Sequence, residues 1–162
     1  MSEIEKHVAG RVKFLVCVDD SPDCRVALRF ACLRARNSDG TVVLLYVIEP
    51  ADFQHWVAVE KLMEEEQREE AEQLLNDLAA EVYDYAEIHP ILVFREGRRS
   101  DEILKLIDED PSINILVLGA APEEEGSNDL VRKLGDELTK RLRIPLTIVP
   151  GNLTDEQLVN IT

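Results

Sequence analysis

Two short stretches of the sequence carry residues that could bind a phosphorylated ligand. Asp19-Asp20-Ser21 follows one apolar run, and Gly126-Ser127 precedes a helical pattern of leucines. Free backbone amides at a helix start attract anions, and a serine is a common N-cap there. Gly119 ends a second apolar run, where a glycine allows a sharp turn and the close approach of a ligand. A strand, a glycine-marked loop and a helix start can together hold phosphate, although many Gly-Ser pairs are only caps.

The two aspartates admit two interpretations. An aspartate at the carboxyl end of a parallel strand can accept a hydrogen bond from a ribose hydroxyl, while the Gly126-Ser127 turn meets the phosphates. Alternatively, Asp19 and Asp20 form a turn and an acidic helix start that the helix dipole stabilises. Both interpretations stay open at this point.

Acidic residues in the second stretch oppose phosphate binding. Glu123, Glu124 and Glu125 lie just before Gly126. A carboxylate about 7 Å from a phosphate charge costs roughly 0.6 kcal/mol at the dielectric of water, and a helix start contributes only about 0.3–2 kcal/mol. A divalent cation that bridges carboxylates and phosphates would reverse this balance. We therefore expect weak or metal-dependent binding.

The sequence contains no pattern typical of a catalytic or metal centre. The three histidines are scattered, without the spacing of zinc ligands. There is no G-x-G-x-x-G after a strand and no G-x-x-x-x-G-K. A phosphoacceptor receiver domain, which Asp19-Asp20 would suit, is disfavoured because Arg95-Glu96-Gly97 supplies no aspartate after the third strand. We assign no catalytic and no metal-binding residue, and an enzyme stays the less favoured alternative.

Composition limits the partners. The net charge of −15 and the sequence pI of about 4.5 oppose binding to nucleic acids and to anionic membrane surfaces. Residues 1–10 lack the apolar core of a signal peptide, so we expect a cytoplasmic protein. The cysteines Cys17, Cys24 and Cys32 form no C-x-x-C pair, and we expect all three to be reduced.

Five short apolar runs alternate with helical patterns along the chain. The predicted strands are residues 12–18, 41–48, 88–94, 115–118 and 144–149. Of the helices after the first four, two begin at residues 22 and 60, and the other two follow the predicted N-caps Ser100 and Ser127. Uniformly apolar strands that alternate with helices indicate an α/β fold with an open, doubly wound parallel sheet covered on both faces. If the first and fourth strands are neighbours, the strand order is 3-2-1-4-5, and Asp19 and Gly119 flank one crevice.

Several motifs in this pattern resemble those of the universal stress protein family over residues 11–150. They are V-x-V-D-D-S, L-L-Y-V-I-E-P, F-R-E-G-x-x-x-D-E-I, I-x-I-L-V-L-G, the G-S pair and I-P-L-T-I-V-P. The resemblance implies a Rossmann-like fold of order 3-2-1-4-5, homodimers through the last strand (144–149), stress-linked regulation and, in one subgroup, ATP binding. Residues 1–10 and 151–162 would flank this domain as a polar N-terminal arm and a polar C-terminal tail.

The resemblance also implies a set of binding residues. The ATP-binding subgroup has a loop of the form G-x-x-G, nine residues and G-[S/T], but here Pro122 replaces the second glycine and the loop is shorter. Proline lacks the amide that a phosphate would need. In the family's site Val47 would meet the adenine. The matching positions are Asp19, Val47, Gly119, Gly126 and Ser127.

We therefore expect a cytosolic regulatory module of this family. It would bind ATP or another adenine nucleotide weakly, or together with Mg²⁺. The alternative is a dimeric interaction protein of the same fold that binds no nucleotide.

Overall fold

The computed structural model describes residues 12–49, 57–121 and 128–162. The strands are β1 (Lys13–Cys17), β2 (Thr41–Ile48), β3 (Ile91–Glu96), β4 (Ile113–Ala120) and β5 (Leu146–Pro150). The helices are α1 (Pro22–Ser38), α2 (Val57–Ala86), α3 (Arg99–Glu109), α4 (Asn128–Thr139) and α5 (Asp155–Ile161). All strands pair in parallel in the order β3-β2-β1-β4-β5, which confirms the predicted fold class and strand order.

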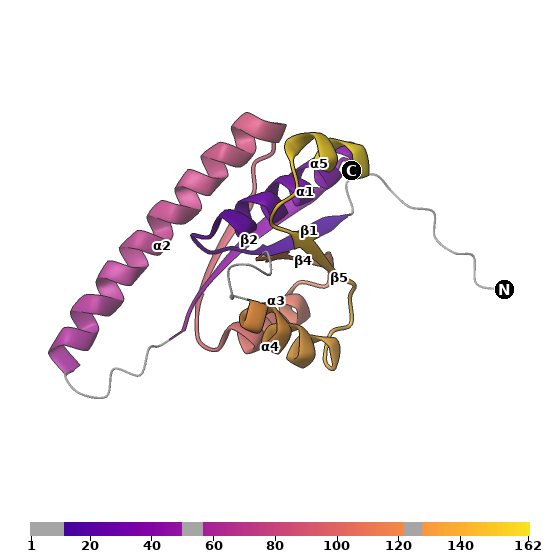
Figure 1. Ribbon diagram of the computed structural model, residues 1–162. Coiled ribbons are helices and arrows are strands. Elements are labelled where there is room, and N and C mark those ends of the chain that lie inside the picture. The colour runs from indigo at the N-terminus through magenta and orange to yellow at the C-terminus, as the bar shows by residue number, and fades with distance from the viewer. Residues whose placement is uncertain (1–11, 50–56, 122–127) are drawn as a thin grey trace.

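The central strand β1 is apolar on both faces because helices cover both faces of the sheet. Phe14 and Val16 pack toward α1 and α2, while Leu15 packs toward α3 and α4, and each is at most 2% exposed. Figure 1 shows α1, α2 and α5 on one side of the sheet and α3 and α4 on the other. The register places Leu15 opposite Val43 of β2 and Leu116 of β4. The carboxyl ends of β1 and β4 therefore lie side by side.

Helix α1 begins as its sequence predicts. The hydroxyl of Ser21 accepts a hydrogen bond from the backbone N–H of Cys24 (3.2 Å), and Pro22 occupies the first helical position. A proline is favoured there because it has no amide to leave unpaired. The turn between β1 and α1 is thus fixed by a side-chain cap.

The start of α3 differs from the prediction that Ser100 caps it. Arg98 is the N-cap residue and makes no side-chain cap, while Ser100 lies inside the first turn and is buried. The carboxylate of Glu49, at the end of β2, accepts the N–H of Arg99 at 3.0 Å instead. A tertiary contact from a neighbouring strand end replaces the local cap.

Two strands begin later than predicted. β3 begins at Ile91, directly after Pro90, because proline has no N–H to donate to the sheet. β5 begins at Leu146, and Ile144 precedes it and packs against the core on the α3–α4 side.

Residues 151–162 form more than a polar tail. Thr154 and Gln157 form a capping box at the start of α5, and Leu158 is fully buried against the α1 side of the core. Burial of a leucine side chain contributes roughly 1.5–3 kcal/mol, so this segment adds to the stability of the domain.

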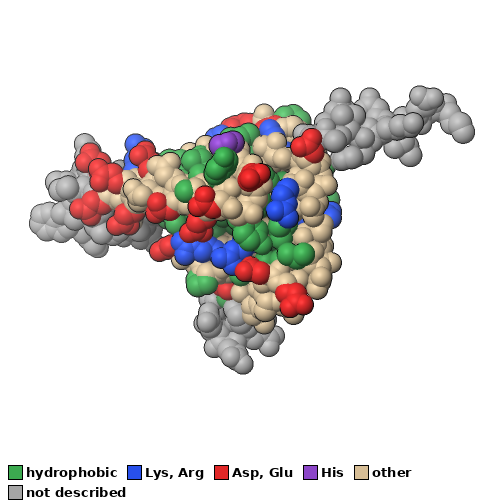
Figure 2. Space-filling model, turned by 90° about the horizontal axis from the view of Figure 1, so that it is seen from above, with side chains coloured by type: hydrophobic (Ala, Val, Ile, Leu, Met, Phe, Trp, Pro, Cys, Tyr) green, Lys and Arg blue, Asp and Glu red, His purple; other side chains and the backbone are tan. Residues whose placement is uncertain are grey.

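Helix α2 is the longest helix and carries a strongly acidic surface. Figure 2 shows acidic side chains gathered along the projecting part of the molecule where α2 lies. The buried residues of its described part are Ala71, Leu75, Leu78, Val82 and Ala86. No helix in the described ranges is long and apolar enough to cross a membrane.

The end of β4 packs directly against the first turn of α1. A Cβ atom on Gly119 would lie 2.5 Å from the carbonyl oxygen of Asp23 and 3.2 Å from the backbone nitrogen of Cys24. Real Cβ atoms essentially never approach another atom as closely as 2.5 Å. The glycine is thus required by the packing of α1, whereas the sequence interpretation related it to the approach of a ligand.

We predict that Gly119→Ala lowers the free energy of unfolding by about 1–3 kcal/mol, because the added methyl group displaces the start of α1. Gly135, within α4, is the matched control, because a Cβ there meets nothing within 4 Å. Gly135→Ala should raise the stability by about 0.5–1 kcal/mol through helix propensity. Urea unfolding of the three proteins measures both effects. Equal stability of Gly119→Ala and the unchanged protein would contradict the packing described above.

Candidate functional site

A small pocket lies at the carboxyl ends of β1 and β4. It has a volume of about 40 Å³ and is lined by Cys17, Val18, Asp19, Ser21, Cys24, Arg99, Leu118, Gly119 and Leu134. Pockets that enclose a small-molecule ligand usually measure about 300–1,000 Å³. The described residues therefore hold one small polar group of a ligand at most, and the rest of such a ligand would lie outside this pocket.

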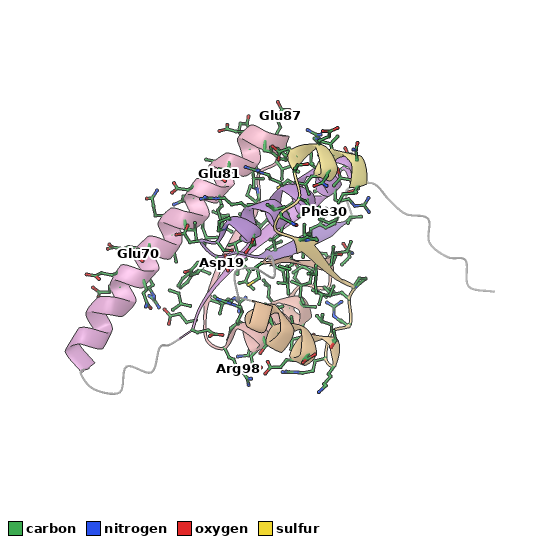
Figure 3. The ribbon with its side chains drawn as sticks, in the orientation of Figure 1. Asp19, Phe30, Glu70, Glu81, Glu87 and Arg98 are labelled. Atoms are coloured by element: carbon green, nitrogen blue, oxygen red, sulfur yellow. The ribbon has the colours of Figure 1, made fainter. Side chains whose placement is uncertain are left out.

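Asp19 lies at the centre of this edge (Figure 3). Its Oδ1 accepts the backbone N–H of Ser21 at 2.8 Å, which closes the turn into α1. Its own N–H contacts the sulfur of Cys24 at 3.4 Å. Asp19 therefore shapes the turn, as one of its two interpretations predicts. Its Oδ2 atom has no hydrogen-bond partner in the described part of the chain and can accept a bond from a hydroxyl group.

Two of the five predicted binding residues come together. Asp19 and Gly119 both line the pocket, one at the end of each strand. The side chain of Val47 does not line it, because it is 4% exposed and packs in the core between the sheet and α3. Gly126 and Ser127 lie outside the described residues, as does the rest of their loop from residue 122.

Arg99 is the residue of this pocket that the sequence analysis missed. It is half-buried at the first position of α3, and it brings a positive charge to the edge that holds Asp19. Its charge lowers the pKa of the Cys17 thiol, against the larger effect of burial, so the guanidinium lies within electrostatic range of the pocket wall. The pair Arg98-Arg99, directly after Glu96-Gly97, is the only signal in the sequence that could have indicated a cation at this edge.

The two thiols at the pocket are unreactive near neutral pH. Burial raises the pKa of Cys17 and of Cys24 to about 12, so both are neutral near pH 7 and neither offers a thiolate nucleophile. Cys32 has its pKa raised to about 12 by burial as well. All three are free thiols in this structure. Among the residues with a described placement, no group of three or more histidine, cysteine, aspartate or glutamate side chains could hold a metal ion.

A larger groove lies beside the pocket, between α2 and the end of β2. It measures about 560 Å³ and is lined by Asp20, Arg25, Tyr46, Glu69, Glu70, Gln73, Leu74 and Asp77. Four of these side chains are acidic and one is basic. The net charge of the groove therefore disfavours phosphate groups.

Comparisons with solved structures show the same fold in other proteins. Universal stress protein UspA from Lactobacillus plantarum matches with a TM-score of 0.73 and 18% identity, over 88% of this chain and 99% of that one. A universal stress protein family protein from Arabidopsis thaliana with AMP bound gives 0.61 and 17%, over 90% and 94%. The universal stress protein from Archaeoglobus fulgidus in complex with dAMP gives 0.57 and 18%, over 85% and 96%.

Comparisons of the sequence with curated proteins and with models of protein families give a second line of evidence on the family. No match to the chain was found among curated proteins. The model of the universal stress protein family, however, matches residues 11–150, which is most of the chain. Together with the strand order and the structural matches, this result shows that the chain belongs to the universal stress protein family.

Proposed function

We propose that the chain is a regulatory module that binds ATP or another adenine nucleotide weakly at the carboxyl ends of β1 and β4. The observation that carries the proposal is the shared pocket, where Asp19 and Gly119 meet. Oδ2 of Asp19 would accept a hydrogen bond from a ribose hydroxyl. Two structures of this fold are described with AMP or dAMP bound, which supports the ligand class. The free thiols suit a reducing compartment such as the cytoplasm.

The charge around the pocket favours weak binding. Asp19, Asp20 and Glu49 lie at this edge, and the whole chain carries −15. Each carboxylate near a phosphate raises the free energy of the complex, more so at low ionic strength, where charges are least screened. Mg²⁺ bound to the nucleotide would offset part of this repulsion.

We predict that Asp19→Asn weakens binding of AMP by about tenfold. Asparagine keeps the oxygen that holds the turn but replaces the free acceptor by an amide donor, and a hydrogen bond to a charged acceptor contributes roughly 1.5–3 kcal/mol. Isothermal titration calorimetry gives the affinity. Thermal unfolding with AMP and with Mg-ATP gives an independent readout, because a ligand of the native state raises its stability.

Asp20→Asn is the matched control for the loss of one negative charge. Asp20 is exposed in the same turn and lines the acidic groove, not the small pocket. Its neutralisation should leave AMP binding unchanged or slightly stronger. Equal effects of the two substitutions would contradict the role of Asp19. No binding of AMP or Mg-ATP to the unchanged protein at millimolar concentration would instead favour the interaction protein that binds no nucleotide.

A homodimer through β5 is a second proposal. β5 pairs only with β4 in the described sheet, and Ile148 is 47% exposed on it. An apolar edge strand with free backbone groups tends to pair with a further strand. β3 forms the opposite edge, where Leu92 is 37% exposed. The family resemblance favours β5 as the edge that is used.

We predict a dimer mass for the unchanged protein at micromolar concentration and a monomer mass for Ile148→Lys, because the lysine brings a charge into the apolar contact. Leu92→Lys, the same change at the other edge, should leave the dimer intact. Light scattering measures the masses, and circular dichroism checks that each variant folds. A monomeric unchanged protein would refute the dimer, and a dimer lost only in Leu92→Lys would place the contact at β3.

A further inference from the structure

We propose that Arg99 binds the phosphate of the nucleotide and makes the site selective for a nucleoside monophosphate over a triphosphate. The inference rests on the proposed nucleotide binding and adds to it a specificity-determining residue and the charge of the ligand. Arg99 faces the pocket from α3, and Asp19 faces it from the end of β1.

The two charges of the pocket are placed to bind different parts of one ligand. Among the described lining residues, Asp19 and Arg99 are the charged ones, and no ion pair joins them. Neither group is therefore neutralised by the other, so the carboxylate oxygen can accept from a sugar hydroxyl and the guanidinium can donate to a phosphate. A guanidinium matches two oxygens of one phosphate group with two parallel hydrogen bonds.

Arg99 differs from the arginines next to it. Arg98 forms an ion pair with Glu137, and Arg95 forms one with Glu109. The guanidinium of Arg99 has no hydrogen-bond or ion-pair partner within the described residues. A half-buried cation that lacks a protein acceptor gains most from an anionic ligand. Figure 3 shows Arg98 at the outer side of the α3–α4 layer, away from Asp19.

Two hydrogen bonds hold the backbone at the start of α3, and they fix the position from which the Arg99 side chain extends. Its N–H donates to Oε1 of Glu49 at 3.0 Å, and the N–H of Gly97 donates to the carbonyl oxygen of Ile48 at 2.9 Å. Both bonds tie the start of α3 to the end of β2. The Arg99 charge also lowers the pKa of the Tyr46 hydroxyl against the larger effect of burial, so it acts on the end of β2 as well.

The number of charges determines the preferred ligand. One guanidinium can balance one phosphate group, but Asp19, Asp20 and Glu49 repel any further phosphates. The second and third phosphates of ATP would meet more acidic than basic described side chains, because the neighbouring groove holds four acids and one cation, Arg25. A monophosphate therefore fits the charge of the edge better than a triphosphate does.

Calorimetric titration with adenosine, AMP and ATP, in excess chelator, tests the inference on the unchanged protein and on Arg99→Gln, Arg99→Lys and Arg98→Gln. We expect AMP to bind at least as tightly as ATP, and about tenfold more tightly than adenosine, because of the charge-assisted bonds. Arg99→Gln should lower the AMP affinity to that of adenosine and leave adenosine unchanged. Arg99→Lys should retain part of the difference, and Arg98→Gln should change none of the three affinities.

The outcomes separate the inference from the proposed function. If AMP binds and Arg99→Gln binds it equally well, or if ATP binds more tightly than AMP, the role of Arg99 is refuted while nucleotide binding stands. Equal losses for AMP and adenosine in Arg99→Gln would show a structural role and also refute it. If neither adenosine nor AMP binds to the unchanged protein at millimolar concentration, both proposals fail together. Thermal unfolding of each variant without ligand confirms that it is folded.

Discussion

The candidate site depends on the backbone contact between the end of β4 and the first turn of α1. Because Gly119 has no side chain, the carbonyl of Asp23 can lie where a Cβ atom would otherwise be. The same contact holds the turn that contains Asp19 beside the end of β4, and the bond from the Ser21 amide fixes the carboxylate within that turn. The geometry of the pocket is therefore a consequence of helix–strand packing.

Most of the fold could be predicted from the sequence because its strands are locally distinctive, whereas the site depends on contacts between distant residues. Central strands buried on both faces are uniformly apolar, so β1 and β4 were identifiable. Arg98 and Arg99 look alike in sequence, and only the ion pair of Arg98 with Glu137 separates their roles. The hydrogen bond that the Arg99 N–H donates to Glu49 at the start of α3 was missed as well, because it also joins residues that are far apart in the sequence. The side chain of Val47 lies in the core on the α3 side, and its predicted contact with an adenine stays a prediction.

The negative charge of the surface around the pocket is the second feature that limits which ligands can bind. In the proposed function, a phosphate approaches a surface that is acidic along α2 and in the groove next to Asp20. Arg99 makes one position at this edge favourable for a single anionic group, while the pocket formed by the described residues is too small to enclose a whole ligand. The proposed weak binding of a ligand of low charge is consistent with both features. Such an affinity would suit a module that responds to changes in nucleotide concentration.

Nuclear magnetic resonance mapping of AMP binding on the ¹⁵N-labelled protein tests the central claim most directly, because it reports the location of the ligand as well as its affinity. We predict that the amide signals of Asp19, Ser21, Arg99 and Gly119 shift most as AMP is added, in a fast-exchange titration typical of weak binding. The signals of the sheet edges, such as those of Leu92 and Ile148, should stay in place. No shifts at millimolar AMP, or shifts confined to α1 and α2 far from this edge, would contradict it.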